Sequence, residues 1–329
     1  MASANVFRQL LEQARPLVAD GAMGTTLFSL GLEGGGCPEL LNVEQSDLVE
    51  KVHRGFVDAG ADIILTNTFG GNRRRLALHK LESRVEELNV AAAKVARRAA
   101  ELADRPVAVA GSIGPTGDLF APLGPLSHEE GVQVFSEQAA ALAKGGADVL
   151  WIETISSFEE LDAACEAARA TGLPIAATLS FDTAGHTMMG ISPIALGEWW
   201  NSNSDISAVG ANCGIGPGDA VAASLGIAAV AREAVTITKA NCGIPLYKSE
   251  GGLTYPIGPE QMVDYVDLSL RSGTRIIGAC CGSTPDHIEA IREAVDTFAG
   301  GPTPDFEEVQ LRLDATAARS GARRERRRR

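Results

Sequence analysis

The sequence contains no apolar run long enough to cross a membrane. A transmembrane helix needs about 18 or more consecutive apolar residues, and every apolar run in this 329-residue chain is shorter. The N-terminus, MASANVFRQLLEQARP, carries charged side chains where a signal peptide would have its apolar core. We therefore expect a cytoplasmic protein that does not enter a membrane.

Cysteine is also scarce, with six residues in the chain. In a reducing compartment such thiols are more often reactive or metal-bound than paired in disulfides. Two of them, Cys280 and Cys281, are adjacent. Neighbouring Cα atoms lie about 3.8 Å apart, whereas a disulfide prefers about 5.5 Å. These two sulfur atoms therefore need a partner other than each other.

Positive charge is scarce outside the C-terminus. Residues 319–329, RSGARRERRRR, contribute +6 to the net charge of −13, so the rest of the chain carries −19. An acidic body argues against nucleic acid as the main partner. The basic tail has no apolar periodicity, and we expect it to be disordered, either as a solvated segment or as a docking segment for an acidic partner.

The first apolar segment is not followed by a G-x-G-x-x-G motif, which argues against a doubly wound dinucleotide-binding fold. The chain instead contains eight short apolar segments rich in β-branched residues, most of them separated by stretches with helical spacing. The eight segments are residues 16–22, 61–71, 106–114, 147–154, 174–182, 206–214, 234–243 and 274–282. Such alternation predicts a parallel sheet, and eight units favour one α/β domain, a (β/α)₈ TIM-type barrel.

The helices between these strands are expected to be amphipathic. The clearest span residues 46–60, 128–146 and 258–273. In the first, Ser46 or Asp47 is the expected N-cap, and Gly60 lies just past the C-terminal end.

Two parts of the chain are distinguished by this pattern. The barrel is predicted to occupy residues 1–300, and residues 301–329 to form a C-terminal extension that ends in the Arg-rich tail.

In a (β/α)₈ barrel the active site forms where the strands end and the βα loops begin. The polar residues at the predicted strand ends are Asp20, Thr66, Asn67, Thr68, Ser112, Glu153, Asp182, Cys213, Lys239, Asn241, Cys280 and Cys281. Alternate strands lie about 9–10 Å apart. Inward-leaning side chains can close that gap to the roughly 3.8 Å between two sulfur ligands of one zinc ion.

Three thiolates with an open fourth position are typical of a catalytic zinc site. We hypothesise that Cys213, Cys280 and Cys281 form one; the alternative is that they pack as small hydrophobes. The motif ANCG occurs twice in the chain, so Cys242 in the second copy is a rival ligand.

The two remaining cysteines are weaker candidates. Cys37 follows a glycine run in the first loop, and Cys165 lies in an Ala-rich helix where packing is the expected role.

A thiolate-rich zinc site is suited to binding a substrate thiol. A free alkyl thiol titrates near 8.5, but a metal-bound thiol is deprotonated. Three protein thiolates also keep the metal electron-rich, so a fourth thiolate remains nucleophilic. The site therefore favours attack by sulfur on an electrophilic carbon, which is alkyl transfer to a thiol.

Six motifs in this order resemble the homocysteine S-methyltransferase family over residues 10–295. They are DGAMGTTL (20–27), NTFGGN (67–72), GSIGP (111–115), IET (152–154), ANCG (211–214) and IGACCGSTPDHI (277–288). The resemblance implies a zinc-binding barrel that transfers a methyl group to homocysteine and forms methionine.

The same resemblance implies roles for individual residues. It makes Cys213, Cys280 and Cys281 the zinc ligands, whereas Cys242 stands where the family has a small residue. Asp20 with Gly21, and Glu153, would bind the ammonium group of homocysteine, and Thr66 and Asn67 would line the pocket. Alternatives are an Asx turn at Asp20 and a surface carboxylate at Glu153.

The methyl donor is left open by the family, whose members use betaine, S-methylmethionine or methylcobalamin. The betaine group carries tyrosines where this chain has Gly70 and Thr154, so an aromatic pair for a quaternary ammonium is missing. A cage built from Trp151, Trp199, Trp200 and Tyr247 is the alternative.

The first loop, residues 37–53, resembles the homocysteine module of cobalamin-dependent methionine synthase. We expect methylcobalamin on a separate corrinoid protein to be the donor. A hypothesis of another class is a thiol- or zinc-binding subunit of a larger methyltransferase, inactive alone.

The histidines are not expected to bind the metal. His53, His79 and His287 are predicted to be surface residues, and His186 lies in the loop after the fifth strand, where it could face the site.

Overall fold

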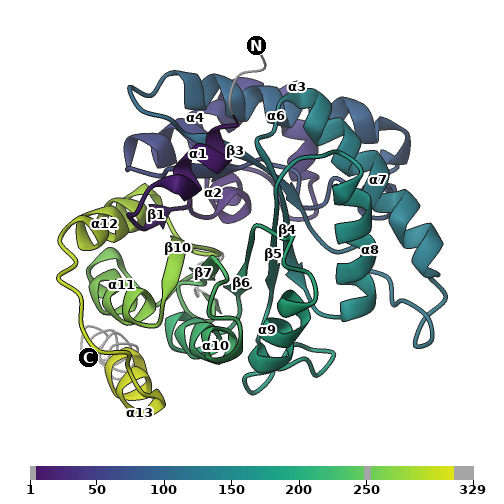
Figure 1. The fold of residues 1–329 in the computed structure, drawn as a ribbon. Helices are drawn as coiled ribbons and strands as arrows, with labels where there is room; N and C mark the ends of the chain where they lie inside the picture. The colour runs from purple at the N-terminus through teal and green to yellow at the C-terminus, as the bar shows by residue number, and fades with distance from the viewer. Residues whose placement is uncertain (1–4, 248–252, 315–329) are drawn as a thin grey trace.

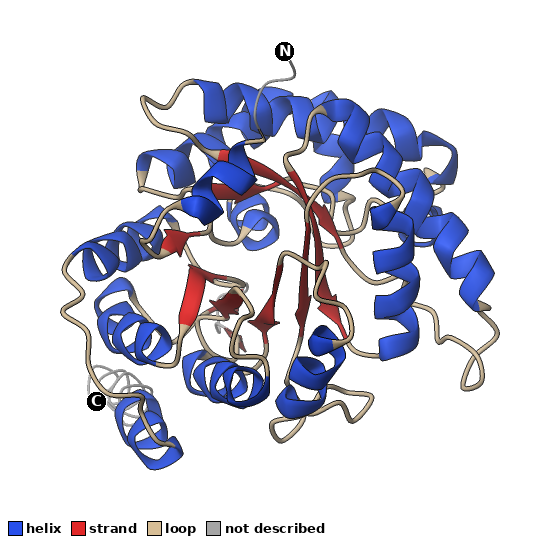
Figure 2. Cartoon of the chain, viewed as in Figure 1, coloured by secondary structure: helices blue, strands red, loops and turns tan. Residues whose placement is uncertain are grey.

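The computed structural model describes residues 5–247 and 253–314. All eight predicted strands are present and parallel, in the order β1–β10–β7–β6–β5–β4–β3–β2. They are β1 (Leu17–Val18), β2 (Ile63–Leu65), β3 (Ala108–Ile113), β4 (Val149–Ile155), β5 (Ile175–Leu179), β6 (Ala208–Cys213), β7 (Thr236–Ala240) and β10 (Thr274–Ala279). Helices surround the strands on the outside (Figures 1 and 2). The predicted (β/α)₈ barrel is confirmed.

The ring closes between β1 and β2, the two ends of the ladder. Because β1 has only two residues, closure depends on the backbone just beyond it. Ala19 forms a parallel bridge with Ile63. The Asp62 amide donates to the Val18 carbonyl at 2.7 Å, and the Asp20 amide donates to the Ile63 carbonyl at 2.9 Å. The first strand therefore joins the ring only up to Asp20.

One or more helices follow each barrel strand along the chain. They are α2 (Met23–Ser29), α3 (Leu41–Glu44), α4 (Ser46–Asp58), α5 (Arg73–Ala77), α6 (Val85–Glu101), α7 (His128–Gly145), α8 (Phe158–Arg169), α9 (Pro193–Asn201), α10 (Pro217–Val230), α11 (Met262–Arg271) and α12 (Pro285–Asp296). A two-stranded antiparallel hairpin, β8 (Leu246–Tyr247) and β9 (Leu253–Thr254), follows β7. Within the described ranges, none of the helices combines the length and apolarity that crossing a bilayer requires.

The barrel interior is filled by alternate strand residues. Trp151 is fully buried there among small neighbours such as Ala110 and Ala176. Phe7 and Leu10 of α1 (Val6–Glu12) join the same cluster. The N-terminal end of the barrel is thus packed with apolar side chains, and the polar residues collect at the opposite end.

Two helix predictions need correction at their ends. The α4 helix begins at Ser46 itself, so Gln45 is its N-cap and makes no side-chain capping bond, contrary to the predicted cap at Ser46 or Asp47. The segment 258–273 divides into a short 3₁₀ turn, η3 (Pro259–Gln261), and α11. Gly60 does follow α4 in the left-handed conformation, with φ of 100°.

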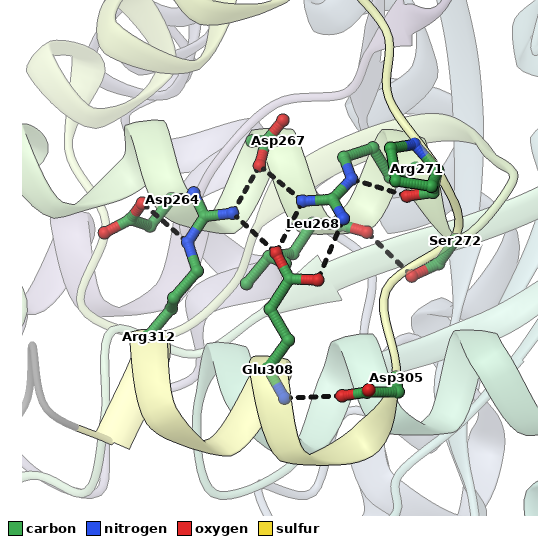
Figure 3. A network of polar contacts seen from close by, with 9 residues as sticks. Asp264, Asp267, Leu268, Arg271, Ser272, Asp305, Glu308 and Arg312 are labelled. Carbon is green, nitrogen blue, oxygen red and sulfur yellow. Dashed lines mark hydrogen bonds and ion pairs between the residues drawn. The ribbon is translucent and has the colours of Figure 1, made fainter.

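The described part of the C-terminal extension packs against the barrel. In α13 (Phe306–Val309) and η4 (Gln310–Asp314), Val309 and Leu313 join the core beneath α11. Glu308 accepts two hydrogen bonds from Arg271, at 2.7 and 2.8 Å, and one from Arg312 at 3.3 Å (Figure 3). Arg312 also pairs with Asp264 and Asp267. The domain boundary at residue 300 stays a prediction, and the Arg-rich tail lies outside the described residues.

His53 was predicted to be a surface residue, and this is wrong. Its side chain is fully buried on the inner face of α4. Among the described residues neither ring nitrogen has a hydrogen-bond partner. Burial lowers the pKa of His53 from 6.5 to about 3, because the protonated ring would lose its hydration without compensation. His53 is buried because it lies on the apolar face of the amphipathic helix α4, which packs against the core.

This burial predicts an acid-dependent loss of stability. Below pH 6.5 the unfolded chain protonates His53 while the folded protein does not, so stability is lost as the pH falls from about 6.5 towards 3. His53→Leu should remove about 2 kcal/mol of the loss between pH 7 and pH 5, as measured by urea unfolding at both values. His79→Leu, at an exposed position, is the matched control. Parallel pH profiles for wild type and His53→Leu would contradict the prediction.

Candidate metal centre and substrate cavity

Three thiols from two strands meet at the C-terminal end of the barrel. Cys213 ends β6, and Cys280 and Cys281 directly follow β10. Their sulfur atoms all lie within 4.8 Å of one another, and the Sγ atoms of Cys213 and Cys280 are 3.0 Å apart. The backbone turns sharply at both places, with φ of 57° at Cys213 and 88° at Gly282. All six cysteines are free thiols.

The end of β7 holds these two turns together. Asn241 lies between them and accepts a hydrogen bond from the Cys281 amide at 2.9 Å. Its side-chain amide donates to the Gly214 carbonyl at 2.7 Å, and its backbone amide donates to the Cys213 carbonyl at 3.2 Å. One asparagine therefore sets the separation of the two cysteine-bearing turns.

The three thiols fit a thiolate-binding metal. Tetrahedral ligation with metal–sulfur bonds of about 2.3 Å would place sulfur atoms roughly 3.8 Å apart, which lies between the 3.0 Å contact and the 4.8 Å limit of the cluster. The three thiols also shift one another's pKa values. Hydrogen bonds from Cys213 and then Cys280 lower the pKa of Cys281 to about 4, while the bond with Cys280 raises the pKa of Cys213.

The other three cysteines lie outside this cluster. The Cys242 side chain is buried in the core, and only its backbone amide reaches the cluster, by donating to the Cys281 carbonyl at 2.9 Å. The Cys37 thiol donates to Glu39 at 3.2 Å. Cys165 is fully buried in α8.

A cavity of about 310 Å³ opens beside the thiols. Its walls include the three clustered cysteines and every residue that the sequence proposed for substrate binding: Asp20, Gly21, Thr66, Asn67 and Glu153. A ligand in the cavity can therefore approach the sulfur atoms and these side chains together.

Glu153, at the end of β4, is buried and held on both oxygens. Oε1 accepts a hydrogen bond from the Ser112 hydroxyl at 2.5 Å, and Oε2 accepts one from the Asn212 side chain at 3.3 Å. Burial, together with the neighbouring Cys280, raises the pKa of Glu153 to about 7. A cation in the cavity would favour its charged form. The alternative reading of Glu153 as a surface carboxylate is wrong.

Asp20 forms a buried ion pair with Lys239 of β7. The Lys239 ammonium donates to the Asp20 carboxylate and to its backbone carbonyl, both at 2.8 Å. The other carboxylate oxygen accepts the Leu65 amide at 2.7 Å. The side chains of the pair are 2% and 1% exposed, so Asp20 is bonded within the protein and does not form the Asx turn considered as its alternative role.

The remaining proposed residues shape the wall. The Thr66 hydroxyl contacts Thr68 at 2.6 Å, and the Asn67 side chain donates to the Pro38 carbonyl at 2.7 Å. At Gly21 a Cβ would lie 2.5 Å from the Ser283 hydroxyl. Thr66 and Asn67 thus organise the loops, and Gly21 permits close packing.

Asn212 is a residue of the site that the sequence did not predict. Buried within the first ANCG motif, it accepts a hydrogen bond from the Thr154 amide at 2.8 Å and donates to Glu153, the Thr154 hydroxyl and the Cys213 sulfur. These contacts hold Thr154 at its positive φ of 63°. The sequence did offer one indication of this role, since Asn212 directly precedes the predicted ligand Cys213.

The prediction that His287 is a surface residue is wrong. His287 is buried rather than exposed, and it contacts Thr284 and the Ile257 carbonyl. His79 is exposed as predicted. His186 is exposed in its loop and is not part of the cavity wall.

The proposed aromatic cage is not formed. Trp151 lies in the barrel interior, the Trp199 indole donates to Asp162, the Trp200 indole donates to the Ile206 carbonyl, and Tyr247 is 90% exposed on β8. None of the four lines the cavity.

Two phenylalanines do line the cavity. They are Phe28 and Phe69, which are 45% and 41% exposed. Gly70 stands where the betaine-using group has a tyrosine. A Cβ at Gly70 would lie 2.9 Å from a Glu39 oxygen, so Glu39 occupies the space of a larger side chain.

Comparisons with known proteins agree with this geometry. A family model described as homocysteine S-methyltransferase matches residues 17–295. The methionine synthases of Mycobacterium leprae (strain TN) and Mycobacterium tuberculosis (strain ATCC 25618 / H37Rv) are 30% and 31% identical and cover 88% and 85% of this chain. This chain spans 25% of the length of each.

A solved structure shares the fold over most of this chain. The metallated form of the homocysteine methyltransferase MmuM from Escherichia coli has a TM-score of 0.74 and 26% identity. The match covers 88% of this chain and 99% of that chain.

The Asn212 contacts generate a prediction. Asn212→Asp replaces a donor with a second carboxylate beside Glu153, so it should lower the free energy of unfolding by about 2–3 kcal/mol at pH 7. Asn201→Asp changes an exposed amide that donates to the Val230 carbonyl, and it should cost less than about 1 kcal/mol. Chemical denaturation measures the free energy of unfolding of both variants. Equal losses of stability would show that the hydrogen bonds of Asn212 contribute no more than those of an exposed asparagine.

Proposed function

Because this chain belongs to the homocysteine S-methyltransferase family, we propose that it transfers a methyl group to the thiol of homocysteine, forming methionine, with a zinc ion held by Cys213, Cys280 and Cys281. The observation that carries the proposal is one cavity that joins three clustered thiols to a buried carboxylate, Glu153. A bound zinc would supply the charge that keeps the acceptor thiol deprotonated at neutral pH.

The protein residues bind and orient the acceptor. Glu153 receives the ammonium group of homocysteine, since its carboxylate lines the cavity and its two hydrogen-bond donors fix its orientation. Thr66, Asn67 and Gly21 form the wall beside it. Asp20 supports the ammonium site electrostatically, but its oxygens are already bonded to Lys239 and Leu65. We therefore assign Glu153 as the direct contact.

For the donor we propose methylcobalamin carried by a corrinoid domain or protein outside this chain. The support is twofold. The curated relatives reported above are methionine synthases about four times as long as the matched region. In addition, Gly70 and Thr154 leave the cavity without the tyrosine pair of the betaine-using group, and Glu39 fills the space beside Gly70.

Phe28 and Phe69 favour a second candidate donor. Two half-exposed rings on the cavity wall could contact a sulfonium or quaternary ammonium, each contact contributing about 0.5–2 kcal/mol. A self-contained enzyme with such a small donor is the alternative. The match to the E. coli homocysteine methyltransferase covers 99% of that chain, so the matched barrel makes up nearly all of it. In a further alternative, the chain is a thiol- or zinc-binding subunit that is inactive alone.

The metal assignment predicts about one zinc per chain. Cys281→Ala should lose zinc because two thiolates bind it far more weakly than three, and the circular dichroism of the barrel should be unchanged. Cys242→Ala is the matched control and should retain zinc, since its sulfur lies outside the cluster. Plasma mass spectrometry measures the zinc content per chain of each variant. Full zinc occupancy in the Cys280→Ala, Cys281→Ala double variant would overturn the assignment.

A donor screen tests the reaction. With homocysteine as acceptor, we expect methylcobalamin to give a higher rate than betaine or S-methylmethionine at matched concentrations. Phe28→Ala with Phe69→Ala should lower the rate about tenfold or more for a small cationic donor. Efficient turnover with betaine or S-methylmethionine alone would replace the corrinoid proposal with the second candidate. Absence of methionine with every donor would favour the subunit hypothesis.

A further inference from the structure

Lys239 is a buried cation that the reaction described above does not use. Its side chain is 2% exposed on β7, yet it contributes to the cavity wall together with Cys280 and Glu153. Burying an ammonium group is costly unless it is paired. Burial alone would lower the pKa of Lys239, but the charges of Asp20, Cys280 and Glu153 and the hydrogen bond to Asp20 together outweigh burial and raise it. The cation is therefore retained at this place in the barrel.

Among the described residues, the recorded acceptors of the Lys239 ammonium both belong to Asp20. An ammonium group has three N–H donors, and within the described part of the chain two acceptors are recorded for it, the Asp20 carboxylate and the Asp20 carbonyl. Both belong to one residue at the end of β1. One donor therefore remains for a ligand in the cavity that Lys239 lines.

Lys239 and Glu153 are opposite charges on the same cavity that do not pair with each other. No ion pair within 4.0 Å joins them among the described residues, and their described hydrogen-bond partners differ. The acceptor in the proposed reaction is a zwitterion whose ammonium and carboxylate share one carbon atom. Separated charges of both signs on one wall match such a ligand.

We propose that Lys239 is a specificity-determining residue that binds the carboxylate of the acceptor, and that Asp20 is the positioning residue that orients it. The inference rests on the proposed function, since it concerns how the same cavity binds the same acceptor. It assigns the two charged groups of the acceptor to different strands, the ammonium to Glu153 on β4 and the carboxylate to Lys239 on β7.

The test compares three thiols by calorimetric binding to the zinc-loaded full chain. They are homocysteine, 3-aminopropane-1-thiol, which lacks the carboxylate, and 4-sulfanylbutanoate, which lacks the amine. Lys239→Met should weaken binding of the two carboxylates about 10- to 100-fold, the range for loss of a charge-assisted hydrogen bond. Binding of 3-aminopropane-1-thiol should change less than about threefold. Glu153→Gln should give the reverse pattern, with 4-sulfanylbutanoate the least affected.

A second variant covers the danger that Lys239→Met fails to fold because Asp20 is left buried without a partner. Asp20→Asn with Lys239→Met removes both charges at nearly constant volume, and it should show the same selective loss. Equal weakening of all three thiols in a folded variant would overturn the inference and indicate a purely structural pair. So would a wild-type protein that binds homocysteine no better than 3-aminopropane-1-thiol.

The failure of the proposed function would look different. Wild-type protein that binds none of the three thiols when loaded with zinc would overturn the proposed acceptor, and the inference with it. Wild-type protein that binds homocysteine, with a preference for the carboxylate that survives Lys239→Met, would overturn the inference alone.

Discussion

The buried pair of Asp20 and Lys239 connects the parts of the barrel on which the cavity depends. The two residues are 219 positions apart in the chain. Asp20 bonds through its backbone amide to β2, through its carboxylate to Leu65, and through its carbonyl to Lys239 and the Ala279 amide. The first strand is too short to close the ring by itself, so one aspartate joins the ends of four strands. Since Ala279 directly precedes the cysteine pair, the same contacts fix where those thiols begin.

The thiol cluster depends on this closure because its members come from strands that are not neighbours. β6 and β10 are separated by β7, and the gap is bridged at the rim, where Asn241 bonds to both turns. On its other side β10 pairs with β1, and the Ala279 amide donates to the Asp20 carbonyl at 3.3 Å. The strand that leads into Cys280 is thus held both by β7 and by the closing strand.

Much of this arrangement could be predicted from the sequence, because strand ends in a barrel share one rim. That rule alone brought Cys213 and the adjacent cysteines together. It could not show that Asp20 is paired with Lys239, since both residues lie on the rim and either could have faced solvent or substrate. The errors at His53 and His287 have another cause. Polar residues on amphipathic helices are normally exposed, and only the packed structure shows which ones the apolar face covers.

The charges in the cavity argue for a dication more strongly than the thiol geometry does. Six acidic groups line one cavity against the single cation Lys239: the three clustered thiols, Asp20, Glu39 and Glu153. They cannot all ionise together in a buried site, so burial and mutual contact raise the pKa of Glu153 and of Cys213. A divalent ion among the sulfurs would remove that conflict for the thiols. It would also leave Glu153 as the carboxylate free to ionise for a substrate cation. In the proposed reaction, the same acids whose charges conflict in the cavity would hold both the metal and the acceptor.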